Sequence, residues 1–69
     1  MDRVTMNALF KRAKLSKRDF SVMLDINYQS VNAWGSNQGI PYWVESWLEN
    51  YTKAKRFEEI SRMVKEMEV

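Results

Sequence analysis

The fold of this chain is decided by residues 17–34, KRDFSVMLDINYQSVNAW. The apolar residues of this stretch that fit a buried face are Phe20, Leu24, Ile26, Val31 and Trp34. The first two are four residues apart and the last two are three apart, which are the spacings of one face of an α-helix. A single helix accounts for the first pair alone. Two helices joined by a tight turn account for all five positions.

Capping residues set the ends of the two predicted helices. Ser16 is a good N-cap for a helix over 17–24, and Asn27 is one for a helix over 28–35. Asp25 falls in the turn, where the chain usually needs a positive φ that aspartate tolerates better than most residues. The pattern therefore predicts a helix-turn-helix.

Amphipathic patterns predict further helices on both sides. One apolar face predicts a first helix over about residues 2–14. It consists of Met6, Leu9, Phe10 and Ala13. After the loop 35–41, Pro41 suits the first turn of a last helix. The apolar stripe of that helix is Val44, Trp47, Leu48, Tyr51, Ala54, Phe57, Ile60, Val64 and Met67. Thr52 is the weak point at which one helix can become two.

Val22 and Met23 are apolar, although the helix-turn-helix pattern turns both away from the central core. Either another helix covers them or they form part of a contact surface. We expect the first or the C-terminal helix to cover them.

Length and composition restrict the possible functions. The 69 residues include no cysteine and no histidine, which excludes disulfides, thiolate chemistry and the usual zinc ligands from what we expect to be one small domain. We expect no metal, no cofactor and no catalytic residue, because no group of side chains has nucleophile-and-base spacing. No segment approaches the roughly 20 apolar residues of a membrane span, and the N-terminus lacks the apolar run of a secretory signal. These features predict a soluble cytoplasmic protein that is not an enzyme.

Charge is unevenly divided along the chain. Residues 1–41 contain six basic and three acidic residues, and residues 42–69 contain five basic residues and six glutamates. The basic half contains the helix-turn-helix, as the binding of phosphate groups requires.

Several positions agree with one known pattern. They are Leu15-Ser16-Lys17-Arg18, Phe20, Leu24, Ile26, Val31, Trp34-Gly35 and Ile40-Pro41. On these residues the segment 9–48 resembles the lambda-repressor-like helix-turn-helix family, also called the Cro or xenobiotic-response-element family. Asp25 replaces the glycine usual at the turn, and Ser21 replaces the usual alanine. The resemblance implies an all-α fold, a compact bundle of four to five helices with a central helix-turn-helix and a long C-terminal helix.

The resemblance also implies a DNA interface, since the second helix of the motif enters the major groove in that family. The positions carried over as base-reading residues are Asn27, Tyr28, Gln29, Asn32 and Ala33. The side-chain amides of Gln29 and Asn32 can pair with adenine, and this helix has no arginine or lysine for guanine, so we expect an A·T-leaning half-site. The positions carried over as phosphate-binding residues are Lys14, Lys17, Arg18, Ser30, Asn37, Gln38 and Gly39.

The C-terminal segment leaves two arrangements open. We divide the chain into a DNA-binding domain over 1–52 and an amphipathic helix over 53–69, which either folds back as a fifth helix or pairs with a second copy. We favour a homodimer, whose reading helices would lie about 34 Å apart on DNA. Its predicted interface residues are Trp43, Trp47, Phe57, Ile60, Val64 and Met67.

The sequence therefore predicts a regulator of transcription that binds double-stranded DNA, encoded by a bacterium or a phage. Repression is favoured because nothing beyond the DNA-binding domain is present to sense a ligand or recruit polymerase. One alternative is an antitoxin-type regulator that also binds a protein toxin through the C-terminal helix. Another is a protein-interaction module that has kept the fold and lost DNA binding, which the modest net charge of +2 favours.

Overall fold

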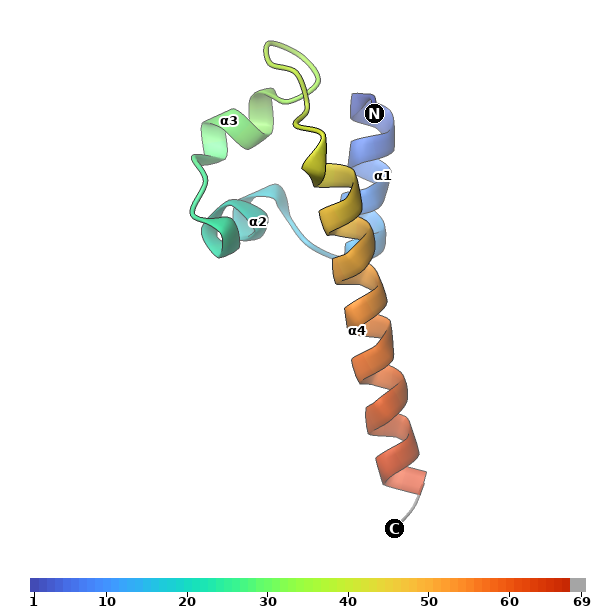
Figure 1. Ribbon diagram of the computed structural model, residues 1–69. Helices are drawn as coiled ribbons and strands as arrows, with labels where there is room; N and C mark the ends of the chain where they lie inside the picture. Colours follow the sequence, from blue (N-terminus) through green and yellow to red (C-terminus); the bar gives the residue numbers. More distant parts are fainter. Residues whose placement is uncertain (68–69) are drawn as a thin grey trace.

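The computed structural model describes residues 1–67, and every regular element among them is a helix (Figure 1). The four helices in chain order are α1 (Arg3–Ala13), α2 (Lys17–Leu24), α3 (Tyr28–Ala33) and α4 (Trp43–Met67). The predicted all-α fold is confirmed, and α2 has the predicted bounds. α1 and α4 run side by side in the same direction, with α2 and α3 on one side of them.

Local hydrogen bonds explain where the helices begin. The backbone N–H of Thr5 donates to the Asp2 carboxylate at 2.8 Å. Hydrogen bonding by Thr5, first from its side chain and second from its backbone, lowers the pKa of Asp2 from its ordinary value of 3.8. Ser16 caps α2 as predicted, since its Oγ accepts from the N–H of Asp19 at 3.0 Å. α3 is two residues shorter than predicted, because Trp34 is already extended (φ −61°, ψ 130°) and its side chain is buried.

The core is centred on the fully buried ring of Phe20 in α2. The ring centroids of Phe10, Trp34 and Trp47 lie 5.2, 6.0 and 5.0 Å from it, each in an edge-to-face arrangement. The ring of Trp43 stacks on it with a centroid distance of 6.1 Å. One phenylalanine therefore joins α1, α4 and the end of α3 through aromatic contacts worth about 0.5–1.5 kcal/mol each beyond the area they bury.

These contacts change the interpretation of two predicted dimer residues. Trp43 and Trp47 are half-buried and pack against Phe20 within the same chain. The sequence pattern could not distinguish packing within the chain from a dimer interface, since both arrangements need apolar side chains on one face of α4. Because each indole already packs against its own core, Trp43 and Trp47 are not free in the way the predicted interface assumed.

α4 is one continuous helix, and residues 53–67 do not fold back as a fifth helix. Thr52 does not break it, because its hydroxyl donates to the carbonyl of Leu48 at 2.9 Å and its side chain is buried. Beyond Thr52, α4 continues past the end of α1, which gives the molecule extents of 52 × 21 × 16 Å (Figure 1). The fold-back alternative is therefore wrong, and the boundary between 52 and 53 lies inside a helix. Of the C-terminal segment, residues 68 and 69 lie outside the described residues.

The expected covering of Val22 and Met23 is also wrong. Their side chains are 75% and 54% exposed on the outer face of α2. The reason is the direction of packing: α1 packs against the N-terminal part of α4, and neither helix extends over this face. Val22 and Met23 thus form a small exposed apolar surface.

Candidate nucleic-acid interface

A three-residue turn over 25–27 sets the position of α3 relative to α2. Asp25 has the predicted positive φ of 54°, and the N–H of Ile26 donates to the carbonyl of Ser21 at 2.8 Å. Asn27 caps α3, since its Oδ1 accepts from the N–H of Gln29 at 2.8 Å. Ile26 packs on the core between these two polar residues. The turn is therefore held by hydrogen bonds on its outside and by an apolar contact on its inside.

α3 presents a polar face to solvent. Val31 is fully buried and anchors the helix, whereas Gln29 and Asn32 are exposed three residues apart on the outer side. Ser30 and Ala33 are half-buried at its margins. Two amide side chains thus stand free at a spacing that lets both reach the edges of neighbouring bases.

Asn27 has a different role from the one predicted by resemblance. Its side-chain oxygen is already engaged in capping α3. Bidentate pairing with adenine needs both the oxygen and the nitrogen of an amide, so Asn27 cannot make that contact while it caps the helix. Its NH2 group alone stays available for a base or a phosphate.

Tyr28 and Arg18 form a contact between α2 and α3. The guanidinium carbon of Arg18 lies 4.8 Å from the centroid of the Tyr28 ring. An exposed cation–π contact of this kind is worth about 0.5–1 kcal/mol. It covers one face of the Tyr28 ring, and it holds the Arg18 charge beside α3. The hydroxyl of Tyr28 remains free to donate to a phosphate.

Lys17 stands in a positive environment that includes a residue missed in the sequence. It is half-buried, and burial together with the nearby charge of Arg3 lowers its pKa from the ordinary value of 10.5. Arg3 itself is exposed at the start of α1. The sequence counts Arg3 as one of several basic residues, and only the packing of α1 brings it to Lys17.

The loop after α3 is held by backbone hydrogen bonds within the segment 33–38. The N–H of Gly35 donates to the carbonyl of Gln38 at 2.7 Å, and the N–H of Gln38 donates to the carbonyl of Ala33 at 3.1 Å. Asn37, Gln38 and Gly39 are all exposed. Because the N–H of Gln38 is used within the loop, only its side chain is free for a phosphate.

Lys14 is not brought to this face. It ends α1 with a positive φ of 53° and lines a hollow between α1 and α4 together with Lys55 and Arg56. The structure thus gathers Arg3, Lys17 and Arg18 near α3 and places Lys14 elsewhere.

The predicted dimer residues of the C-terminal half of α4 are exposed. Phe57, Ile60, Val64 and Met67 have between 48% and 84% of their side-chain surface accessible. Met63, which was not among the predicted residues, is 61% exposed beside them. These five residues form an apolar surface that we call the α4 seam.

Two kinds of site are absent from residues 1–67. No helix among them is long and apolar enough to span a membrane. No group of three or more carboxylates in this range is placed to hold a metal ion.

No known family matches this chain. A comparison with models of protein families gave no match, and neither the curated proteins nor the solved structures contain one with significant similarity to it.

Proposed function

We propose that this protein binds double-stranded DNA in a sequence-dependent way and regulates transcription, with α3 as the helix that reads the major groove. The observation that carries the proposal is the position of Gln29 and Asn32. They are exposed on the outer face of a helix that Val31 and the turn fix in place, next to the charges of Lys17 and Arg18. This combination of free amides and neighbouring cations is what base reading and backbone binding together require.

The chemistry of α3 favours A·T base pairs. A side-chain amide offers one donor and one acceptor, which match N7 and the N6 amino group of adenine, and each such pair is worth about 1–3 kcal/mol of discrimination. The sequence of α3, YQSVNA, contains no arginine or lysine to make the usual contact with guanine. We therefore expect adenines at the positions that Gln29 and Asn32 face.

Backbone contacts come from the basic residues around α3. Arg18 is held beside Tyr28, and Lys17 lies near Arg3 at the start of α2. Burial and, after it, the charge of Arg3 lower the pKa of Lys17, and a phosphate between the two residues offsets the repulsion by Arg3, so binding is favoured there. A protein bound in this way at a promoter blocks polymerase, and we propose repression as its effect.

The experiment that tests the proposal is selection from a random duplex pool at about 100 mM salt, followed by sequencing. We expect an enriched A·T-leaning motif. Enrichment of G-rich sites would contradict the assignment of Gln29 and Asn32. No enrichment by a protein shown to be folded would exclude sequence-specific binding and leave the interaction module as the better explanation.

A matched set of variants distinguishes base reading from general weakening. Gln29→Ala and Asn32→Ala should each relax the preference at one position and weaken binding to the selected site by about 10-fold or more, at 1–3 kcal/mol per contact. Asn50→Ala removes the same amide from an exposed position of α4 and should leave both properties unchanged.

We also propose that the α4 seam pairs with a second copy of the chain. Phe57, Ile60 and Val64 recur at three- and four-residue spacing, so two parallel copies would stack like residues on like. Met63 within the seam and Ser61 beside it carry no charge, so the copies meet without repulsion at the centre of the seam. A seam of barely two heptads gives a weak dimer, which DNA with two half-sites stabilises by holding both copies.

The alternative partner for the exposed α4 seam is a different protein, such as the toxin that an antitoxin binds. A dimer that forms from purified protein alone supports the second copy. A chain that stays monomeric even on DNA supports the other protein.

A further inference from the structure

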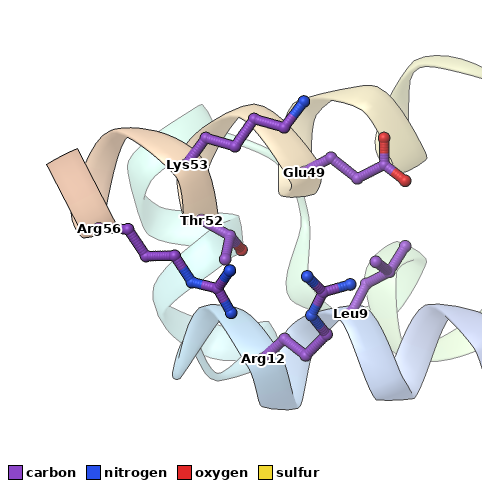
Figure 2. Close-up of a pocket in the computed structure, with 6 residues that line it drawn as sticks. All are labelled: Leu9, Arg12, Glu49, Thr52, Lys53 and Arg56. Carbon is purple, nitrogen blue, oxygen red and sulfur yellow. The ribbon is translucent and has the colours of Figure 1, made fainter.

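A groove runs between α1 and the middle of α4, away from the proposed DNA-binding surface on α2 and α3. It consists of two adjoining hollows of about 260 Å³ each, which share Arg12, Thr52 and Arg56. Figure 2 shows this groove with α1 and α4 around it and the ribbons of α2 and α3 behind them. A ligand in the groove would therefore not occupy the proposed reading face.

The charge of the groove is strongly positive. Its basic residues are Arg12, Lys14, Lys53, Lys55 and Arg56. Its carboxylates are Glu49 and Glu59 alone, so five positive charges meet two negative ones. The resulting excess of three exceeds the net charge of +2 of the whole chain. The rest of the protein is thus slightly acidic, and the excess positive charge of this groove attracts anions.

Two arginines converge at the centre of the groove. The guanidinium groups of Arg12 from α1 and Arg56 from α4 reach toward each other beside Thr52 (Figure 2). None of the side-chain hydrogen bonds among residues 1–67 uses either group. Their ten N–H donors in all are therefore available to a ligand, at about five for each arginine.

The neighbouring groups favour an acceptor between the arginines. The hydroxyl proton of Thr52 is already donated to the carbonyl of Leu48 at 2.9 Å, so Thr52 adds no donor to the groove. Two like charges that face the same hollow repel each other until an anion lies between them. A phosphate group, with a charge near −2 and several acceptor oxygens, matches two guanidinium forks better than a single carboxylate does.

We propose that the groove binds a small molecule through a phosphate group held between Arg12 and Arg56. Lys53 lines one hollow and Lys55 the other. The Lys55 ammonium lies 5.5 Å from the centroid of the Tyr51 ring, and Figure 2 shows that of Lys53 pointing away from the arginines, so these flexible side chains must turn inward to meet a second phosphate, as in a diphosphate. A concave hollow of this size admits one or two phosphate groups and excludes the convex side of a DNA duplex. Bound there, the ligand joins α1 to α4 and stabilises the fold.

The test is a titration of the whole chain with inorganic pyrophosphate at constant ionic strength, followed by calorimetry and by the melting temperature. We expect saturable binding at one site per chain and a rise in melting temperature. Arg12→Gln and Arg56→Gln should each weaken binding at least 10-fold. Both arginines are exposed, so the variants should keep the helical circular dichroism of the parent.

Arg62→Gln is the matched control, because it removes the same charge from an exposed position of α4 beyond the groove. It should bind pyrophosphate as the parent does. Arg56→Lys keeps the charge and removes the planar fork, and it should bind more weakly than the parent. Equal binding by the parent and both groove variants would overturn the proposal.

The source of the phosphate is distinguished by comparing orthophosphate, pyrophosphate and ATP. Tighter binding of pyrophosphate than of orthophosphate supports two phosphate subsites, and still tighter binding of ATP shows that a nucleoside adds contacts. A short DNA duplex should bind the Arg12→Gln and Arg56→Gln variants as it binds the parent. If these variants lose duplex affinity as strongly as pyrophosphate affinity, the groove holds the DNA backbone and the small-molecule proposal is wrong.

Discussion

Gly35 is constrained by its backbone and by a close neighbour. Its φ is +84°, a value that residues with a side chain rarely adopt. A Cβ added there would lie 2.8 Å from the Cβ and 3.3 Å from the Cα of Arg3. Because the first of these atoms begins the side chain and the second is backbone, α1 itself would have to move. Gly35 thus lets the loop after Trp34 pass close to the start of α1.

We predict that Gly35→Ala lowers the free energy of unfolding by about 1–3 kcal/mol, through strain at the positive φ and the contact with Arg3. Chemical denaturation monitored by circular dichroism measures this. Gly39→Ala is the matched control, since a Cβ at Gly39 meets nothing within 4 Å. It should be neutral or stabilising by up to about 1 kcal/mol. Equal losses in both variants would contradict the role given to Arg3.

Lys17 is a residue whose charge is costly to the fold. Burial and the charge of Arg3 lower its pKa, so the folded state binds the proton less tightly than the unfolded chain. The cost is fully present below the lowered pKa. It disappears as the pH rises from that value toward 10.5. A charged residue that is unfavourable for stability and faces the proposed phosphate contact indicates a function in binding.

We predict that Lys17→Met raises the melting temperature at neutral pH and weakens DNA binding. The gain in stability should shrink as the pH approaches 10.5, because the lysine of the parent then loses its charge. Thermal melts across pH and a DNA titration measure the two effects. Lys65→Met, on the exposed C-terminal turns of α4, should change neither. A destabilised Lys17→Met protein would contradict the cost assigned to the charge.

α4 is an element with two environments. Its N-terminal part buries Val44, Leu48 and Thr52 against the domain, and its C-terminal part leaves the α4 seam open to water. Only the N-terminal part of α4 packs against the rest of the domain. Its C-terminal part is a short helix in water, which needs a further contact to be stable. The seam supplies the apolar surface for that contact.

We predict that Ile60→Asp abolishes self-association, because a carboxylate would be buried at the centre of the seam. Sedimentation measured over a range of protein concentrations should show a monomer–dimer equilibrium for the parent and a monomer for the variant. On DNA the variant should keep its affinity for a single half-site and lose at least 10-fold on a palindrome. Arg62→Asp, two residues along on the same helix, should still dimerise. A parent protein that is monomeric at all concentrations and on DNA would contradict the second copy as partner.

At the scale of the whole molecule, positive charge is distributed over two faces. Arg3, Lys17 and Arg18 serve the proposed DNA interface, whereas the larger excess lies in the groove between α1 and α4. The two faces should therefore respond to different ligands.

We predict that DNA binding by a dimer depends on salt with a slope near −5 in a plot of log K against log salt concentration, as about six phosphate contacts require. Arg3→Gln should reduce the slope by about 2, since each of two protomers loses one contact. Fluorescence anisotropy at several salt concentrations measures both slopes. Arg56→Gln should leave the slope unchanged. An equal change for Arg3→Gln and Arg56→Gln would show that the two faces are not separate.

Local features of the chain were predictable because neighbours in sequence produce them. The capping by Ser16 and Asn27, the positive φ of Asp25 and the bounds of α2 all depend on residues within a few positions of each other. The helical spacing of Met6, Leu9 and related residues likewise fixes which face is buried. The exposed amides of α3 follow from the same spacing.

Contacts between distant segments were not predictable in this way. The sequence does not say that Trp43 and Trp47 pack on Phe20 or that Arg3 lies near Lys17. Nor does it say that Lys14 lines the groove and lies away from the proposed DNA interface. Each depends on how α1 and α4 lie against the helix-turn-helix, and an apolar or basic residue fits several such arrangements equally well.

The sequence by itself determined the helices, the caps at Ser16 and Asn27, the turn and the buried faces of α1 to α3, because hydrogen bonding and helical periodicity act over a few residues. The tertiary structure alone decided that α4 continues unbroken past Thr52, that Val22 and Met23 stay exposed, and that five basic residues gather in one groove. These outcomes depend on the relative placement of whole helices, which the burial of aromatic rings around Phe20 fixes and no local pattern encodes.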